Sequence, residues 1–488
     1  MEALLGEKLR VIDVLPAPQS HASSMRAWWR RAYILPSMGI CLLVCAWFVT
    51  WADWEFFAPE SFCRYYDAQA LSILHGRLDV PAEAIGFEAF VFEKKFYGYF
   101  GIGPAILRLP LVLLLGDLNG LSSRAIMMMA CIINVVCAYG ILRALRPADA
   151  NPTRNERVIG SLFILCAGIG STNVFLMSRS FVFHEATMWA GAFALACAWA
   201  VIRYRQAGKT TSLIFASVCG LLSFHSRPTS GFGAFLMIGW LAILLVRELI
   251  ADSSRGRPLH TSIALFAVLF TVASYCAVNY AKFRTFESIP QRYYQLYLQN
   301  PERMQITAGR QLHVENIATN ATNYFGWYGL QLRDAFPWFS LNDEATIIGS
   351  PAIDVVEPFS TIPISMPALT LLGFAGSVAF VRDPNVKSAR LPAVALWIGG
   401  AIVLMTVGIT ERYLHDFYPA LIICAAVGVL RLRLWPRQTL VTVALGLLAV
   451  VSISLNCAFG LVYQRAAPWG VPPAKRAEFI RWQQFFDR

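Results

Sequence analysis

Long apolar segments recur along this chain, and they constrain its fold more than any other feature. Of its 488 residues 57% are hydrophobic and 15% are charged, whereas soluble proteins carry about 25% charged residues. A membrane-spanning helix needs roughly 20 apolar residues. Segments of suitable length and polarity cover residues 33–51, 125–145, 158–177, 184–202, 211–224, 231–246, 261–280, 366–381, 391–409, 413–430 and 440–462. The sequence therefore predicts an all-α polytopic membrane protein with about eleven transmembrane helices.

Basic residues gather in alternate connections between these segments, which indicates how the chain crosses the membrane. Lys and Arg favour cytoplasmic loops, and the five basic connections lie at residues 143–157, 203–209, 247–257, 382–390 and 431–437. With the N-terminus inside, all five fall inside only if residues 101–116 do not cross. That segment is short and contains Pro104, Arg108 and Pro110. We interpret it as a re-entrant or membrane-surface segment.

This topology divides the chain into alternating membrane modules and outer loops. We expect a cytoplasmic tail (1–32), an N-terminal transmembrane module (33–280) with a first outer loop (52–124), a second outer loop (281–365), a C-terminal transmembrane module (366–463) and an outer tail (464–488). The net charge of +11 is accounted for by the inner loops. With no aromatic-basic module, we expect no nucleic-acid partner.

The first outer loop carries acids, bases and aromatic residues directly after an apolar segment. If residues 60–74 are helical, Glu60, Arg64 and Asp67 share one face at i, i+4 and i+7, and Phe62 and Tyr66 lie opposite. We expect amphipathic helices on the membrane surface here. Ionisable groups beside a bilayer are costly and indicate function, so we expect a catalytic carboxylate in this loop.

Several cations lie at the outer ends of apolar segments, against the usual charge bias. Arg and Lys bind phosphate through charge-assisted hydrogen bonds. We therefore predict that a phosphate group is held at this surface. The candidate phosphate ligands are Lys94, Lys95, Arg179, His184, Arg227, Arg412 and His415.

The chain resembles the GT-C superfamily of membrane glycosyltransferases, which includes dolichyl-phosphate-mannose and aminoarabinose transferases. The resemblance rests on Pro59-Glu60-Ser61, on Arg64-Tyr65 followed by Ala70-Leu71 and Gly76, on residues 97–104 (YGYFGIGP) and on residues 411–419 (ERYLHDFYP). It implies a hexosyl- or pentosyltransferase that takes sugar from a polyprenyl-phosphate donor. The acceptor would be a lipid, glycan or protein.

The same resemblance places the active site on the non-cytoplasmic face, and we expect the periplasmic side of a bacterial inner membrane. It points to Asp67, Glu60 or Glu88 as the catalytic acid, with Arg64 and Tyr97 as further substrate-binding residues. The family's paired acidic motif is absent, so the choice among the three acids stays open. We expect no cofactor and no metal ion.

Two other functions fit a chain with many spans. An O-antigen-type polymerase or ligase also has a large outer loop and outer arginines, but it does not need an acidic, amphipathic first loop. A transporter would place ionisable groups in mid-span within broken helices. The centres of the apolar segments here are nearly free of charge, which disfavours a transporter.

Overall fold

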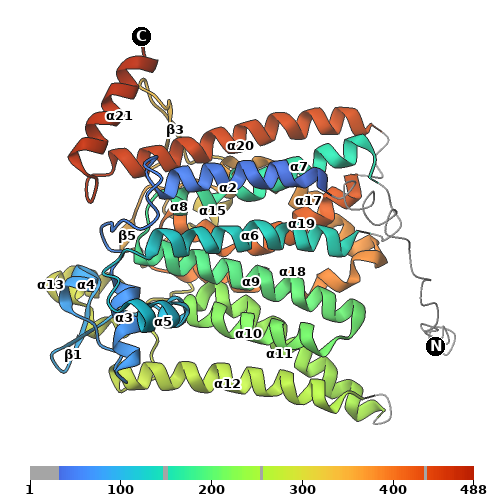
Figure 1. Ribbon diagram of the computed structural model, residues 1–488, viewed down its shortest axis with the longest axis horizontal. Coiled ribbons are helices and arrows are strands. Elements are labelled where there is room, and N and C mark those ends of the chain that lie inside the picture. Colours follow the sequence, from blue (N-terminus) through green and yellow to red (C-terminus); the bar gives the residue numbers. More distant parts are fainter. Residues whose placement is uncertain (1–31, 147–151, 253–255, 433–436) are drawn as a thin grey trace.

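The computed structural model describes residues 32–146, 152–252, 256–432 and 437–488. Long helices run side by side in one bundle, and short elements gather at one end of it (Figure 1). We call this the loop-rich end. Over the described residues the structure is mainly helical, with three two-stranded sheets. The predicted tail falls on residues 1–31, which lie outside the described residues, as does Arg433 of the last basic connection.

Each predicted apolar segment contains a helix of the bundle. Seven helical stretches among the described residues are long and apolar enough to cross a membrane, so this is an integral membrane protein. α2, α10, α17 and α19 are shorter, and the number of crossings stays a prediction. The bundle helices are α2 (Leu35–Val49), α6 (Ser123–Leu145), α7 (Arg154–Gly168) continued by α8 (Thr172–Met177), α9 (Val182–Ala207), α10 (Thr210–Ser226), α11 (Pro228–Ala251), α12 (Pro258–Phe283), α17 (Pro367–Arg382), α18 (Lys387–Ala401), α19 (Tyr418–Leu432) and α20 (Gln438–Ala466).

Two of the predicted segments end differently from expectation. The segment 391–409 is helical only to Ala401, and it continues as the 3-10 helix η5 (Ile402–Met405) and the strand β6 (Gly408–Ile409). The segment 413–430 begins within the 3-10 helix η6 (Glu411–Asp416), and α19 starts at Tyr418. Apolar content alone did not separate helix from these extended and 3-10 turns, because all of them are buried.

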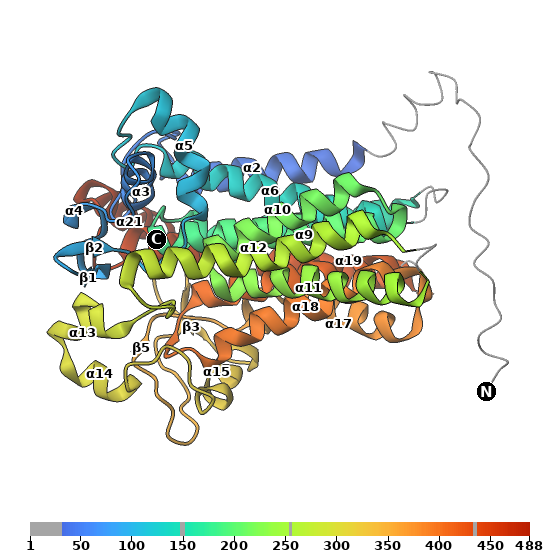
Figure 2. The ribbon, with the colours of Figure 1, turned by 90° about the horizontal axis from the view of Figure 1, so that it is seen from below.

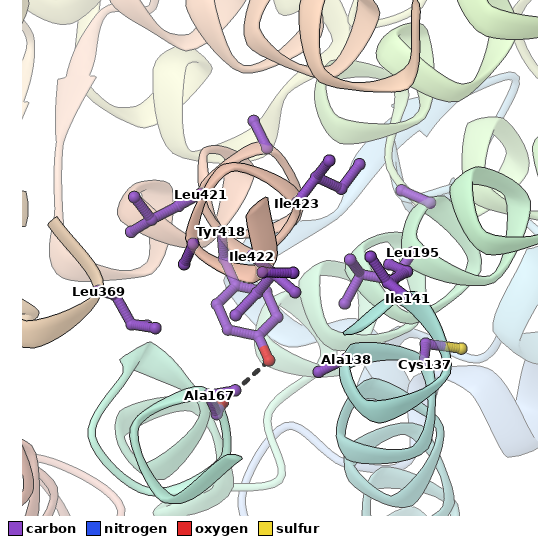
Figure 3. Close-up of a cluster of buried hydrophobic side chains, with 14 of the residues drawn as sticks. Cys137, Ala138, Ile141, Ala167, Leu195, Leu369, Tyr418, Leu421, Ile422 and Ile423 are labelled. Carbon is purple, nitrogen blue, oxygen red and sulfur yellow. Dashed lines mark hydrogen bonds between the residues drawn. The ribbon is translucent and has the colours of Figure 1, made fainter. Parts of the chain in front are cut away.

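Helix α9 lies at the centre of the bundle. In its most apolar stretch 94% of the residues are buried, and it packs against α6, α10, α11 and α18. Small residues let helix backbones approach closely in membrane proteins, and α9 supplies Ala190, Gly191 and Ala194. Tyr418 lies in a cluster of buried hydrophobic side chains (Figure 3). Its hydroxyl donates to the carbonyl of Ala167 at 2.9 Å.

The first outer loop and the second outer loop meet at the loop-rich end (Figure 2). The rings of Phe90 and Tyr294 stack with centroids 4.7 Å apart, and the amide of Gln295 donates to the carbonyl of Ala89 at 2.9 Å. The first loop forms α3 (Tyr65–Leu74), α4 (Ala82–Ile85), η2 (Gly86–Glu88), the antiparallel pair β1 (Phe90–Phe92) and β2 (Lys95–Tyr97), and α5 (Gly103–Leu115).

The second loop and the C-terminal segment supply the rest of this end. Strands β3 and β4 are antiparallel, and β5 pairs in parallel with β6, so the second loop is joined to the turn before η6. The elements are η3 (Gln291–Tyr293), α13 (Gln295–Gln299), α14 (Pro301–Thr307), α15 (Asn316–Phe325), β3 (Leu330–Leu332), β4 (Phe339–Leu341), β5 (Val355–Val356), α16 (Ile362–Ser365) and α21 (Pro473–Phe486).

Helix α5 stays at the loop-rich end beside α3 (Figures 1 and 2). It has 13 residues, too few to span a bilayer of about 30 Å hydrocarbon thickness at 1.5 Å per residue. Its C-terminal leucines 113, 114 and 115 are 72%, 79% and 69% exposed. This arrangement agrees with a surface or re-entrant segment.

The bundle predicts on which side of the membrane each connection lies. Cysteines placed at Glu302 and at Lys209, both exposed, should react with a membrane-impermeant thiol reagent from opposite sides, because the two residues lie at opposite ends of the helices. The measurement uses sealed vesicles and a background without native cysteines. Labelling of both from one side would contradict this topology.

Candidate active site

Asp67 lies inside a buried ion triad rather than on a solvated surface. The Arg108 Nε donates to Asp67 Oδ1 at 2.7 Å, and Arg108 Nη2 donates to Glu185 Oε2 at 2.9 Å. The Ser122 hydroxyl and the Gly120 amide also donate to the Asp67 carboxylate, at 2.5 and 2.7 Å. The side chains of Arg108 and Asp67 are 0% exposed. The triad joins α3, α5 and α9, so Asp67 holds the first outer loop on the bundle.

The predicted helix over residues 60–74 is shorter than expected. Helix α3 begins at Tyr65, and Phe62 has a φ of 57°, so Glu60 and Asp67 do not share a helical face. The Cys63 thiol donates to the carbonyl of Glu60 at 2.8 Å, which closes a turn before the helix. Helical phase misplaced Glu60 because the residues before Tyr65 form a turn rather than the first turn of the helix.

Glu60 is anchored by four donors. Arg179 Nε donates to Glu60 Oε1 at 2.8 Å. The backbone amide and hydroxyl of Ser180 donate to Oε2 at 3.0 and 2.8 Å, and Trp51 Nε1 does so at 3.3 Å. These bonds fix the carboxylate at the junction of α2, the first loop and the turn before α9.

A cavity of about 690 Å³ opens beside Glu60. We call it the Glu60 cavity. Its walls come from the end of α2, the first loop, the start of α6 and the C-terminal segment. It is lined by Trp51, Asp53, Pro59, Glu60, Ser61, Phe62, Arg64, Asn119, Arg124, Gly470, Pro472, Ala474 and Lys475. Arg64, a predicted substrate-binding residue, therefore does face a cavity together with one of the predicted acids.

Glu88 has a different environment from Asp67 and Glu60. Its side chain is partly exposed, and it accepts a hydrogen bond from the Tyr294 hydroxyl at 2.9 Å. Burial raises the pKa of Glu88, while the Tyr294 hydrogen bond and the positive charge of Arg412 oppose that rise. A carboxyl group whose pKa is raised by burial near a specific charge is a candidate for proton transfer.

Two of the predicted phosphate ligands meet on one aromatic ring. The guanidinium of Arg227 lies 4.9 Å from the ring centroid of Tyr413, and that of Arg412 lies 5.5 Å from it. Arg227 pairs with Asp416 at 3.1 Å, and Arg412 pairs with Glu357. The side chains of Arg227 and Arg412 are 14% and 15% exposed. We call the set of Glu88, Arg227, Tyr294, Glu357, Arg412, Tyr413 and Asp416 the Glu88 cluster.

Three other predicted phosphate ligands are buried and engaged within the protein. Arg179 is bound to Glu60 and to the carbonyl of Gly470, 2.9 Å away. His184 Nδ1 lies 3.0 Å from the carbonyl of Arg179 and so carries the proton. His415 Nδ1 contacts the Thr172 hydroxyl at 2.9 Å. All three side chains are therefore held by protein partners.

The remaining predicted residues lie apart from these groups. Lys94 and Lys95 are exposed at the β1–β2 turn. Tyr97 is buried and packs on Phe283 with centroids 5.5 Å apart.

The Glu411 carboxyl, next to Arg412, accepts from the Ser360 amide at 2.6 Å, and burial raises its pKa to about 8. Burial thus favours the neutral form of the Glu411 carboxyl.

Sequence reasoning missed several partners at these sites. Tyr294 and Glu357 come from the second outer loop, and Arg124 and Lys475 come from α6 and α21. The aromatic character of the second loop was visible in the sequence, but pairing across loops was not. Arg108 was an anomaly within an apolar segment, and such a residue signals a buried partner.

Among the residues that the structure describes, no group of three or more His, Cys, Asp or Glu side chains could hold a metal ion.

Comparison with known proteins finds only distant structural likeness. Neither a protein-family model nor a curated protein matches the sequence. The apo Archaeoglobus fulgidus oligosaccharyltransferase aligns with a TM-score of 0.48 and 11% identity over 93% of this chain. The archaeal oligosaccharyltransferase AglB from Archaeoglobus fulgidus, in complex with an inhibitory peptide and a dolichol-phosphate, aligns at 0.47 and 13% over 94%. This chain spans 60% of the length of each. At these scores the likeness assigns no activity.

The buried triad predicts a large effect on stability. Arg108→Gln leaves the carboxylates of Asp67 and Glu185 buried without their shared cation. Breaking a buried pair in this way costs about 3–5 kcal/mol, which thermal unfolding of the purified protein can measure. The matched control is Arg77→Gln, because the Arg77 side chain is 60% exposed and exposed pairs contribute about 0–1 kcal/mol. Equal shifts for both variants would rule out a structural role for the triad.

Proposed function

We propose that this protein is a membrane glycosyltransferase of the GT-C type. It would transfer a sugar from a polyprenyl-phosphate donor to a lipid, glycan or protein acceptor, on the outer face of a bacterial inner membrane. The observation that carries the proposal is the Glu88 cluster: a partly exposed carboxyl group whose pKa is raised by burial lies within the field of Arg412, and Arg412 shares the Tyr413 ring with Arg227.

Glycosyl transfer needs a base for the acceptor hydroxyl. As the acceptor oxygen attacks the anomeric carbon, its proton passes to a carboxylate. Glu88 suits this step better than the other two acids. It accepts one hydrogen bond from the described residues, from Tyr294, whereas the Asp67 and Glu60 carboxylates are each bound by several donors. A raised pKa also makes the Glu88 carboxylate a stronger base.

The same transfer releases a prenyl phosphate that gains negative charge. Preorganised cations stabilise such charge best where water is limited. Arg227 and Arg412 are held in place by Asp416 and Glu357 and retain further N–H groups for the leaving phosphate.

Replacing Glu88 tests the assignment of the base. Glu88→Gln should lower kcat for transfer by about 10²–10⁴-fold, the usual contribution of a general base, while preserving shape and hydrogen bonding to Tyr294. The measurement is transfer of labelled sugar from polyprenyl-phosphate donors in membranes. Glu83→Gln, at an exposed residue of the same loop, is the matched control and should retain the wild-type rate. An active Glu88→Gln enzyme would reject Glu88 as the base.

The pH profile gives an independent test of the same residue. The Tyr294 hydroxyl lowers the pKa of Glu88 by binding its charged form. Tyr294→Phe should therefore raise that pKa and move the acid limb of kcat/KM to higher pH, because the Glu88 carboxyl then keeps its proton to a higher pH. A profile that does not move would show that Glu88 does not control the acid limb.

A further inference from the structure

The C-terminal helix α21 lies at the edge of the loop-rich end. It follows α20 after the connection 467–472, turns away from the direction of α20 and ends beyond the outline of the bundle (Figure 1). Helix α20 has 29 residues, which extend about 43 Å at 1.5 Å per residue, whereas the hydrocarbon core of a bilayer is about 30 Å thick. A helix of this length reaches the headgroup region, so α21 begins close to the membrane–water boundary.

One face of α21 is fixed on the bundle. Phe479 is 3% exposed, and the ring of Trp482 stacks on Trp47 of α2 with centroids 6.3 Å apart. The Glu478 carboxylate accepts a hydrogen bond from Arg465 Nη1 at 2.8 Å. Positions 478, 479 and 482 lie on one side of a helix. Helix α21 is therefore packed in a defined orientation and presents its opposite face outward.

The opposite face is exposed and combines apolar with basic side chains. Ile480 and Phe485 are 48% and 72% exposed. The helix contains three cations and one acid, and the acid, Glu478, is held on the inner face. Arg476 and Arg481 form no ion pair with any residue that the structure describes. The exposed residues recur at helical spacing: Ala477, Ile480, Arg481, Gln484 and Phe485.

The tip of the β3–β4 hairpin extends this surface. The ring of Phe336 stacks on that of Phe486 with centroids 4.5 Å apart. Beside this contact Leu332, Trp338 and Phe486 are 78%, 44% and 51% exposed. We call Leu332, Trp338, Phe485 and Phe486 the apolar patch. Two segments that are distant in sequence thus share one exposed apolar surface.

The bilayer is the partner that fits the apolar patch. Exposed contiguous apolar surface marks a contact with protein or membrane. Only 28% of the most apolar stretch of α20 is buried, and Leu447 and Val450 are 66% and 63% exposed. Acyl chains therefore lie along the helix from which α21 projects. Aromatic side chains together with arginine are typical of helices that lie in the membrane interface, and cations without a protein counter-ion suit anionic headgroups.

We propose that α21 and the tip of the β3–β4 hairpin form an interfacial anchor on the bilayer leaflet next to the loop-rich end. The apolar patch enters the boundary between headgroups and acyl chains, and Arg476 and Arg481 attract anionic headgroups. The anchor is a contact with the bilayer surface. It involves no substrate and is independent of the proposed transfer reaction.

Collisions of a spin label with probes from the two phases test this contact. A nitroxide is attached at Phe485→Cys in the full-length protein, in a background without native cysteines, and the protein is reconstituted into vesicles of phosphatidylcholine and phosphatidylglycerol. The label should collide more often with oxygen, which partitions into lipid, than with a water-soluble nickel chelate present on both sides. Labels at Leu447→Cys, 66% exposed on α20, and Glu302→Cys, exposed on α14, are the lipid and water references.

Two results of this measurement would overturn the proposal. A label at position 485 that behaves like the one at position 302 lies in water rather than in the interface. A label shielded from both probes is covered by protein, which would assign the apolar patch to a protein partner.

The lipid composition tests the role of the arginines. In vesicles without phosphatidylglycerol the label at position 485 should collide more often with the nickel chelate, because the anionic headgroups no longer hold α21 on the surface. Arg476→Gln combined with Arg481→Gln should abolish this dependence. The matched control is Arg77→Gln combined with Arg292→Gln, whose side chains are exposed in the two outer loops, and it should keep the dependence. Dependence that survives in the Arg476→Gln, Arg481→Gln variant contradicts the assigned role.

A photocrosslink gives a second measurement that needs no cysteine replacement. With benzoylphenylalanine in place of Phe485 in the otherwise native protein, irradiation in phospholipid vesicles should add the mass of one phospholipid. Benzoylphenylalanine in place of Glu302 is the control and should add none. A crosslinked pair of protein chains at position 485 would assign the apolar patch to a second copy and reject the anchor.

Discussion

The loop-rich end depends on one buried ion triad. Arg108 on α5 binds Asp67 on α3 and Glu185 on α9, and it does so where all three side chains are removed from solvent. Burying charge is unfavourable unless geometry and further hydrogen bonds offset the lost hydration. Ser122 and Gly120 supply those bonds to Asp67. The first outer loop is thereby placed against the most buried helix of the bundle.

Fixing that loop creates two distinct charged sites. On one side, Glu88 meets the second outer loop through Tyr294 and lies within the field of Arg412, which shares the Tyr413 ring with Arg227. On the other, Glu60 and Arg64 face the start of α6 and the C-terminal segment. Arg179, a candidate phosphate ligand, binds Glu60 and the carbonyl of Gly470. Of the three candidate acids, Asp67 lies in the buried triad, Glu60 lines the Glu60 cavity and Glu88 accepts a hydrogen bond from Tyr294.

The positions of the bundle helices could be predicted because the bilayer imposes a simple rule. A span must be long, apolar and internally hydrogen-bonded, so hydropathy located helices near 125–145, 184–202 and 440–462, where α6, α9 and α20 lie. The described helix ends that flank the basic connections lie opposite the two large loops, as the charge bias predicted (Figure 1). The 3-10 helix η5 and the strand β6 escaped prediction because these buried segments are as apolar as helices.

The candidate site was only partly readable. The sequence showed that acids and cations gather on the outer ends of helices, because charges that contradict the topological bias stand out in an apolar chain. It identified Arg227, Arg412, Glu60, Glu88 and Arg64, but not their partners. Tertiary structure alone decided that Arg108 donates to the Asp67 carboxylate, that Tyr294 donates to Glu88 and that Lys475 lines the Glu60 cavity. Those outcomes depend on contacts between segments far apart in the chain, which periodicity and composition do not encode.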